Sequence, residues 1–366
     1  MKEISTLIKP TNQCNMRCKY CFHEKYGYSS KLLEIEKLKK YIELLCSEYD
    51  YINVVWHGGE PLIAPLSFYE EIYDFCDKQS SDFLFTVQTN GTLLNQEKID
   101  FFKERDTNIG LSFDGLNNDY TRSHTKEIVN NINLLQENGF RPGAILVVNN
   151  KNVKGLIDEY SLFNSMNVGL KLNPMFIDGA AAKNLDLSLN PDEYIKEFIK
   201  FFKYWTKDKN GKINVATCIE LVNLILSEHT GVCTFNSCLS KWLCLDSDAN
   251  IYPCDRLCTS NYLLGNVDDL NSIAEVFDSA NFIKLLKTSV DRRKQCMDEC
   301  QYYKNCYSGC NANAILNQND KYKNGVSCHI QKGILSGIKD YVLETVNNEK
   351  DLNPQYIKAL KRLKTN

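Results

Sequence analysis

Three cysteines lie within the eight residues "CNMRCKYC" at positions 14–21, with the spacing C-x3-C-x2-C. A structural zinc site usually has four protein ligands, and no fourth cysteine or histidine completes a common zinc-finger spacing nearby, although His23 is close. Three thiolates instead leave one iron of a 4Fe-4S cluster without a protein ligand. We therefore predict that Cys14, Cys18 and Cys21 hold such a cluster.

A larger set of cysteines lies in the last third of the chain. Eight thiolates are enough to ligate two further 4Fe-4S clusters with four protein ligands each. The eight are Cys238, Cys244, Cys254, Cys296, Cys300, Cys306, Cys310 and Cys328. Cys233 and Cys258 lie close enough in the sequence to act as substitutes. A zinc ribbon is the alternative for this region, but the C-x2-C pairs of ribbons are missing.

The composition predicts the cellular compartment of the protein. The N-terminal residues lack the pattern of a signal peptide, and no stretch approaches the roughly 18 apolar residues of a membrane span. The sequence therefore predicts a cytoplasmic protein, in which clustered thiols are metal ligands more often than disulfides. A net charge of -3, with acidic and basic residues interspersed, argues against nucleic-acid and membrane partners.

The elements that must position these cysteines alternate between strands and helices. Six apolar or β-branched runs are typical of strands, and they lie at residues 4–8, 52–57, 83–88, 109–113, 144–148 and 168–173. Helical patterns separate them, such as residues 34–49. This alternation predicts the α/β class, with a parallel sheet curled into a partial (β/α)6 barrel that resembles a TIM barrel. Catalytic groups should then follow the carboxyl ends of the strands.

Four motifs lie where catalytic groups are expected, directly after predicted strands, and the chain becomes rich in cysteine further on. "CNMRCKYC", "HGGEP", "QTNG" and "SFDG" follow the first four predicted strands. A proline-started helix at residues 191–205 comes later, and cysteines dominate from residue 233. We therefore predict a barrel domain at residues 1–230, a cysteine-rich domain at 231–340 and a helical tail at 341–366.

Residues 4–230 resemble the radical S-adenosylmethionine (SAM) superfamily, through the cysteine loop after the first strand and the motifs after the next three. The resemblance implies that SAM chelates the open iron and is reductively cleaved to methionine and a 5'-deoxyadenosyl radical. It also implies SAM contacts from Gly58, Gly59, Glu60, Gln88, Asn90, Ser112, Asp114 and Arg122. The stretch before Arg122 reads "NNDYTR", which departs from the family's usual "HD…R".

The late cysteines resemble the SPASM extension, named after the maturation enzymes of subtilosin, pyrroloquinoline quinone, anaerobic sulfatases and mycofactocin. Ligands interleave in that family, which implies Cys238, Cys244, Cys254 and Cys310 for the nearer auxiliary cluster. Cys296, Cys300, Cys306 and Cys328 would hold the farther one. Three residues separate Cys296 from Cys300, where the family usually has two. Three 4Fe-4S clusters and SAM are thus the expected cofactors.

Asp255 directly follows Cys254 in "YPCDRL". The chain resembles the anaerobic sulfatase maturases in its length, in "LIKP" before the first motif and in its late cysteine spacing, and the matching aspartate is the base in those enzymes. A substrate radical that loses an electron becomes more acidic at the adjacent heteroatom, so the resemblance implies that Asp255 accepts a proton. A surface or capping aspartate is the alternative. We expect His57 to be a packed loop histidine.

Three phrases, "VVWHGGEPL", "CDRL" and "LNPMFIDGAA", resemble maturases of ribosomal peptides that form cyclophane or thioether crosslinks. The leading hypothesis is an enzyme that oxidatively modifies a residue of a ribosomally synthesised precursor peptide. The alternatives are a sulfatase maturase that forms formylglycine, and a non-catalytic iron-sulfur scaffold or electron carrier.

The expected partners follow from that hypothesis. They are the peptide and an electron donor of the flavodoxin or ferredoxin type, in an anaerobic or microaerobic bacterium. Because only 13 residues precede Cys14, the peptide's leader must be held by a separate recognition protein or by the barrel and SPASM surfaces.

Overall fold

A computed structural model of the chain describes all residues except 228–232, 236–237, 317–323, 347–351 and 365–366. Contacts divide the chain into two compact units, and each is described by itself. Unit 1 comprises Met1–Ser112, His124–Phe140 and Cys238–Val290, and unit 2 comprises Phe113–Ser123, Arg141–Ser237 and Asp291–Asn366. Both units gather separate stretches of sequence, so the domain boundaries at residues 230 and 340 stay predictions. Among the described helices, none has the length and apolar character that a membrane span requires.

Unit 1 is built on a sheet whose strands follow the order β4-β3-β2-β1-β7-β8-β9. The strands are β1 Glu3–Ile8, β2 Tyr51–Trp56, β3 Asp82–Thr89, β4 Asn108–Ser112, β7 Trp242–Leu245, β8 Asn250–Tyr252 and β9 Gly265–Asn266. Neighbours from β4 to β7 run parallel, and β8 and β9 add an antiparallel extension. The first strand therefore lies between β2 and β7, so the early and late cysteine loops leave neighbouring strands.

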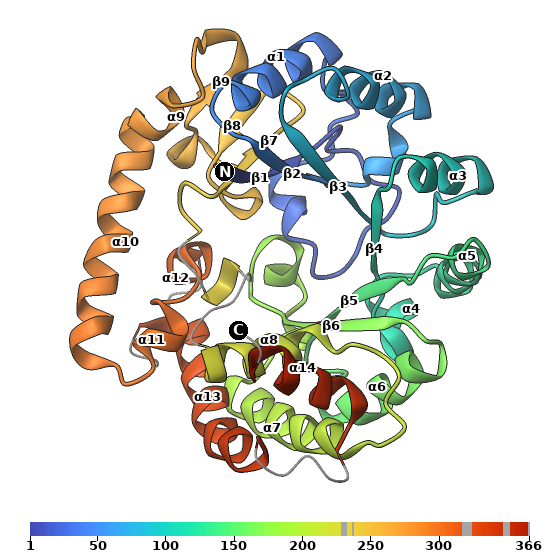
Figure 1. The fold of residues 1–366 in the computed structure, drawn as a ribbon, viewed down its shortest axis with the longest axis vertical. Helices are drawn as coiled ribbons and strands as arrows, with labels where there is room; N and C mark the ends of the chain where they lie inside the picture. The colour runs from blue at the N-terminus through green and yellow to red at the C-terminus, as the bar shows by residue number, and fades with distance from the viewer. Residues whose placement is uncertain (228–232, 236–237, 317–323, 347–351, 365–366) are drawn as a thin grey trace. The chain divides into compact units, whose positions relative to one another are not determined.

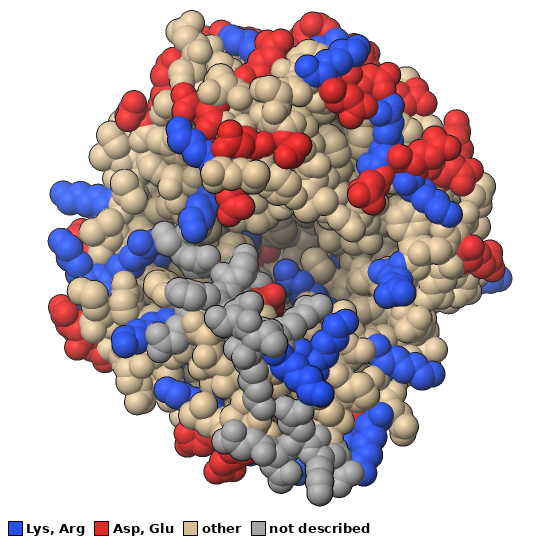
Figure 2. Space-filling model, in the orientation of Figure 1, with Lys and Arg blue, Asp and Glu red and all other residues tan. Residues whose placement is uncertain are grey.

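Unit 1 also contains helices, of which α1 and α2 lie beside the first strands in Figure 1. They are α1 Ile35–Cys46, α2 Leu66–Cys76, α3 Gln96–Glu104, α5 Thr125–Glu137, α9 Glu275–Asp278 and α10 Ala280–Glu299, whose last turns extend beyond the unit. The core between helices and sheet is aromatic, since Trp56 is fully buried and stacks with Tyr73 and Phe85. Figure 2 shows acidic and basic side chains intermixed over α1 and α2, where Lys39 pairs with Glu71 at 2.6 Å.

Unit 2 contains the parallel strands β5 Gly143–Val148 and β6 Gly169–Pro174. Its helices are α4 Asn118–Thr121, α6 Leu156–Ser165, α7 Pro191–Lys207, α8 Ala216–Ser227, α11 Tyr303–Cys306, α12 Asn311–Leu316, α13 Gly325–Thr345 and α14 Pro354–Lys364. Helix α7 begins where Asn190 caps it and Pro191 occupies its first turn, as the sequence predicts. Its aromatic face, which includes Phe198 and Trp205, is fully buried.

Close packing of two helices places the late cysteines of unit 2. Gly333 and Gly337 of α13 face Ile195 and Ile199 of α7, and a β-carbon on either glycine would collide with the opposite isoleucine. The two helices lie side by side in Figure 1. Because the glycines let α13 approach α7 closely, the amino-terminal turn of α13, which carries Cys328, is held in one position.

The predicted α/β class is confirmed. The six expected strands are β1 to β6 in chain order, and each is followed by helical structure. The pairs β1–β2, β2–β3, β3–β4 and β5–β6 are all parallel.

Candidate active site

The first cysteine loop follows β1 and precedes a short 3-10 helix, Phe22–Tyr26. Its three cysteines are all half-buried. The Met16 N–H donates to Cys14 Sγ at 3.4 Å, and the Asn90 amide lies 4.0 Å from the same sulfur. Backbone and amide donors at the sulfur of a ligand stabilise the thiolate form that iron requires. The donor set therefore fits the predicted cluster, and the ligand assignment stays a prediction.

Two glycines bring the "GGEP" loop against the chain just before Cys14. The Gly59 N–H donates to Thr11 O at 3.2 Å, and the Glu60 N–H donates to Gln13 O at 2.8 Å. A β-carbon on Gly58 would lie 2.5 Å from Thr11 O, and one on Gly59 would collide with the carbonyls of residues 12 and 13. Gly58 also has a φ of 125°, which side chains rarely adopt. Glycine at both positions is thus required for this close approach.

The Glu60 carboxylate is fully buried and connects two loops. It accepts hydrogen bonds from Leu62 N at 3.0 Å, from the Thr89 hydroxyl at 2.7 Å and from Asn90 N at 2.7 Å. These bonds tie the loop after β2 to the end of β3 and hold it beside the first cysteine loop. The role of Glu60 toward SAM stays a prediction.

The other predicted SAM contacts divide between the units. In unit 1, the Asn90 amide donates to Asn15 in the first cysteine loop at 2.8 Å. The Gln88 amide donates to Ser112 Oγ at 3.0 Å, which joins the ends of β3 and β4. In unit 2, the buried Asp114 accepts from Val147 N at 3.0 Å and from the Thr121 hydroxyl at 2.6 Å. Arg122 is half-buried at the end of α4 in the same unit.

Unit 1 contains the late cysteines Cys238, Cys244, Cys254 and Cys258. The Cys258 sulfur lies 3.7 Å from that of Cys244. The buried Lys9 ammonium donates to Cys258 Sγ at 3.2 Å and approaches Asp255 O at 3.5 Å. Burial opposes ionisation of Cys258, but the hydrogen bond from Cys244 and the charge of Lys9 lower its pKa overall. Its place in the sequence predicted Cys258 as a substitute ligand, whereas Lys9 carries no motif that would predict a role.

The structure brings Asp255 next to the first cysteine loop, which adjacency to Cys254 alone did not predict. Its Oδ2 lies 4.0 Å from His23 Nε2 and 3.8 Å from His57 Nδ1. Burial, followed by the charge of Lys9, lowers the pKa of His23 well below its usual value. Burial also lowers the pKa of His57, although Asp255 opposes the shift. Both imidazoles are therefore neutral at physiological pH.

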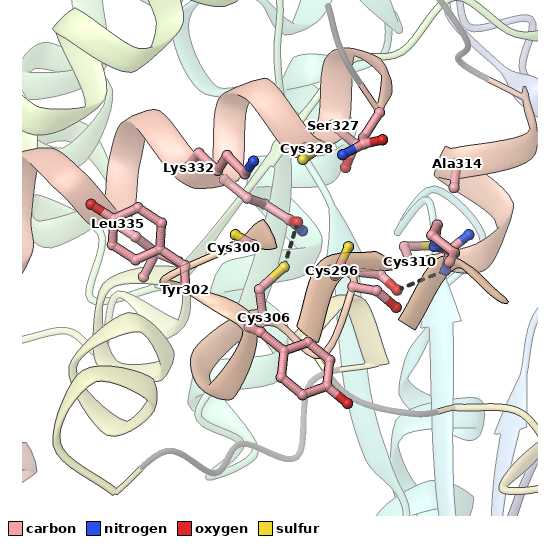
Figure 3. Close-up of a pocket in the computed structure, with 16 residues that line it drawn as sticks. Cys296, Cys300, Tyr302, Cys306, Cys310, Ala314, Ser327, Cys328, Lys332 and Leu335 are labelled. Atoms are coloured by element: carbon pink, nitrogen blue, oxygen red, sulfur yellow. Dashed lines mark hydrogen bonds between the residues drawn. The ribbon is translucent and has the colours of Figure 1, made fainter. Parts of the chain in front are cut away.

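Unit 2 contains a pocket lined by five cysteines, as Figure 3 shows. The sulfurs of Cys296, Cys300, Cys306 and Cys328, the ligands that the resemblance implies for one cluster, turn toward one another. Cys310 lines the same pocket, as do Arg292 and Lys332.

Nearby polar groups fit thiolate ligands in this pocket. Burial raises the pKa of Cys306 to about 12, so this thiol ionises in the pocket only with a metal or a cation beside it. Arg292 is anchored to Asn311 Oδ1 at 2.7 Å, and the Cys306 thiol donates to Gln331 Oε1 at 3.1 Å. The assignment of each cysteine to a cluster stays a prediction.

The family model of the radical SAM superfamily matches residues 8–161. This chain carries a radical SAM domain. Among curated relatives, it is 27% identical to the cysteine-type anaerobic sulfatase-maturating enzyme of Clostridium novyi, over 90% of this chain and 92% of that protein. It is also 27% identical to the serine-type enzyme of Bacteroides thetaiotaomicron, over 73% of this chain and 72% of that one.

Solved structures show the same fold. The sulfatase-maturating enzyme anSMEcpe with bound AdoMet and the Cp18Cys peptide has a TM-score of 0.83 at 22% identity, covering 95% of this chain and 100% of that chain. Streptococcus suis SuiB bound to its precursor peptide SuiA has a TM-score of 0.62 at 14% identity, covering 89% and 76%. The chain is an enzyme, and the radical SAM domain at residues 8–161 implies a 4Fe-4S cluster and SAM.

Proposed function

We propose that this radical SAM enzyme oxidatively modifies a residue of a ribosomally synthesised precursor peptide and forms a carbon-carbon or thioether crosslink. The observation that carries the proposal is the position of Asp255, which lies within about 4 Å of two side chains from the loops after β1 and β2. A carboxylate there faces the loops that the family uses for its radical chemistry. Peptides bound in the two solved relatives support a peptide substrate.

Eleven cysteines are proposed to hold the iron-sulfur centres. Cys14, Cys18 and Cys21 would hold the first, Cys238, Cys244, Cys254 and Cys310 the nearer auxiliary one, and Cys296, Cys300, Cys306 and Cys328 the farther one. When bound, these centres supply the electron that cleaves SAM and accept the electron that the substrate radical gives up. The residues proposed to contact SAM are Gly58, Gly59, Glu60, Gln88, Asn90, Ser112, Asp114 and Arg122.

The protein's own part in the reaction is to position the peptide and to take its proton. Asp255 would accept a proton from the heteroatom next to the oxidised carbon. The Lys9 ammonium holds the Asp255 carbonyl, and Lys25 donates to Arg256 O at 3.2 Å, so the backbone that carries the base is fixed on both sides. A fixed base loses less entropy when the substrate binds.

Sulfatase maturation is the second candidate, because both curated relatives named above are sulfatase-maturating enzymes. Mass spectrometry separates the two. The chain is co-expressed either with short peptides encoded beside its gene or with a sulfatase segment containing the target cysteine or serine. Loss of two hydrogens from a peptide encoded beside the gene supports the proposal. If only the sulfatase segment is modified, to formylglycine, sulfatase maturation would replace peptide crosslinking as the function. A ferredoxin or flavodoxin donor and a cytoplasmic location belong to the same proposal.

The cofactor assignment has its own test. Anaerobically reconstituted protein should bind about twelve irons, which is four per cluster. Replacing Cys14, Cys18 and Cys21 together by alanine should remove about four irons and abolish SAM cleavage. A triple variant that still forms 5'-deoxyadenosine would exclude these residues as the ligands of the radical-generating centre.

A further inference from the structure

Three side chains from separate loops of unit 1 surround one small space. His23 lies in the 3-10 helix after the first cysteine loop, His57 directly follows β2, and Asp255 follows Cys254. The ligand atoms His23 Nε2, His57 Nδ1 and Asp255 Oδ2 all lie within 4.8 Å of one another. The two imidazole rings also face each other, with centroids 5.4 Å apart and planes inclined by 35°.

Neither of these imidazole nitrogens has a hydrogen-bond partner among the described residues, and both atoms are inaccessible to water. The His23 side chain is only 6% exposed and that of Asp255 only 14%. Leaving a buried polar atom unpaired costs about 1–3 kcal/mol. Two such atoms aimed at one carboxylate, at distances too long for hydrogen bonds, mark a site built for a group that the chain does not supply.

We propose that His23, His57 and Asp255 bind one divalent first-row transition-metal ion, separate from the iron-sulfur clusters. Two imidazoles and a carboxylate are the donor set of catalytic zinc and of non-haem ferrous sites, which keep open positions for a substrate. Metal-ligand distances of about 2.0–2.2 Å place tetrahedral ligand atoms about 3.3–3.6 Å apart. The pairs at 3.8 and 4.0 Å therefore need only a small contraction to hold one ion.

The surrounding charges leave room for a cation. The Lys9 ammonium donates to Cys258 Sγ at 3.2 Å and to Asp255 O at 3.5 Å, so its hydrogen bonds are directed at groups other than the two imidazoles. Neither His23 Nε2 nor His57 Nδ1 has a hydrogen-bond partner among the described residues, so each can turn a lone pair toward a metal.

This inference deepens the proposed function and rests on it for the role of the ion. A metal in this site offers an open position to a thiol, hydroxyl or amide of the peptide and makes that group lose its proton more readily. Asp255 Oδ2 would hold the ion, which would lower the pKa of the substrate group, and the other oxygen of the Asp255 carboxylate would still accept the proton that this group loses. The site therefore favours substrates that present a heteroatom next to the oxidised carbon.

Zinc is the probe, since iron in the clusters would obscure added iron. Reconstituted holoenzyme is titrated with zinc sulfate by anaerobic calorimetry, and its zinc X-ray absorption edge is measured. We expect one zinc per chain with nitrogen and oxygen neighbours at about 2.0–2.2 Å and no sulfur at about 2.3 Å. His23→Ala and His57→Ala should weaken zinc binding at least about 10- to 100-fold with unchanged iron content. His124→Ala, at an exposed histidine paired with Glu127, is the matched control.

The outcomes separate this inference from the proposed function. No zinc, zinc with sulfur neighbours, or equal zinc binding in the two histidine variants would each overturn the metal site. Any of these results leaves the peptide product measurable. Conversely, the protein could bind zinc as expected and modify no precursor peptide. This result would contradict the proposed substrate and support the metal site.

Discussion

Asp255 is held through its backbone by Lys9, so its carboxylate can be changed while its position is kept. Asp255→Asn keeps the size of the side chain and removes the basic oxygen. We expect unchanged iron and continued 5'-deoxyadenosine formation, while mature peptide falls at least about 10²-fold, the low end of a general-base contribution. Anaerobic iron analysis and mass spectrometry of the peptide measure this. Asp248→Asn, at an exposed residue paired with Lys31, should change neither.

Loss of iron together with product in Asp255→Asn would mean that Asp255 only positions the ligand Cys254. Unchanged iron with unchanged product would remove Asp255 from the mechanism.

Glu159 of α6 gives unit 2 a pH-dependent stability. It is 1% exposed, and burial raises its pKa to about 7, although Leu116 N at 3.0 Å and the Asn117 amide at 3.3 Å donate to it. The unfolded pKa is about 4.3, so the native state binds more protons between these values, and the free energy of unfolding falls as the pH rises through this range. The loss over the whole range should be about 4 kcal/mol.

Glu159→Gln stays neutral and should remove most of this decline. Urea midpoints at pH 5 and pH 8, measured anaerobically, check it. Glu137→Gln, at an exposed glutamate, serves as the control and should leave the decline in place.

At the scale of elements, the loop after β2 tests whether close backbone approach organises the first centre. Gly59→Ala places a methyl group against the carbonyls of Asn12 and Gln13, so the loop before Cys14 must move. We expect a loss of about four irons and of SAM cleavage, with the late cysteines still loaded. Gly155→Ala, whose added carbon would make only an ordinary 3.9 Å contact with Asp158, is the matched control. Full iron in Gly59→Ala would show that the loop tolerates the shift.

The pocket between α11 and α13 tests the auxiliary centres. Cys306→Ala removes a half-buried thiol that donates to Gln331 and faces three other cysteines. We expect about four irons to be lost while 5'-deoxyadenosine still forms, because the first cysteine loop belongs to the other unit. Peptide product should disappear. A variant that keeps product would show that this centre is dispensable.

The hydrophobic periodicity of the sequence was enough to predict the six strands. The spacing of the cysteines was enough to suggest which thiols bind iron. Strand alternation placed β1 to β6, and the helical pattern predicted at residues 34–49 contains α1, whose Leu38, Ile42 and Leu45 are buried. The sequence could not predict the pairing of β7 with β1, because the two are more than two hundred residues apart.

The contacts that this pairing creates were missed for the same reason. Lys9 had no local signal of function, and His57 was expected to be a packed loop histidine. Only the tertiary structure shows His57 facing Asp255, with its Nδ1 unpaired among the described residues.

For the whole molecule, β7 covers an edge of β1 that would otherwise be open. A chain ending at residue 237 lacks β7, β8 and β9, whereas one ending at residue 290 keeps them. Both lose the same end of unit 2, from residue 291 onward, so they form a matched pair. Because an uncovered strand edge pairs with other chains, we expect the shorter chain to aggregate far more. Its soluble fraction after expression measures this, and equal solubility would contradict it.

The two lysines that donate hydrogen bonds to the backbone around Asp255 limit how chimeras of this protein can be designed. Lys9 and Lys25 lie in the first loop, yet they hold carbonyls of residues 255 and 256. The cysteine-rich segment of this chain, grafted into a relative that lacks these lysines, would lose both hydrogen bonds that hold the backbone around Asp255. Chimeras intended to exchange peptide specificity should therefore exchange residues 9–26 and residues 238–266 together.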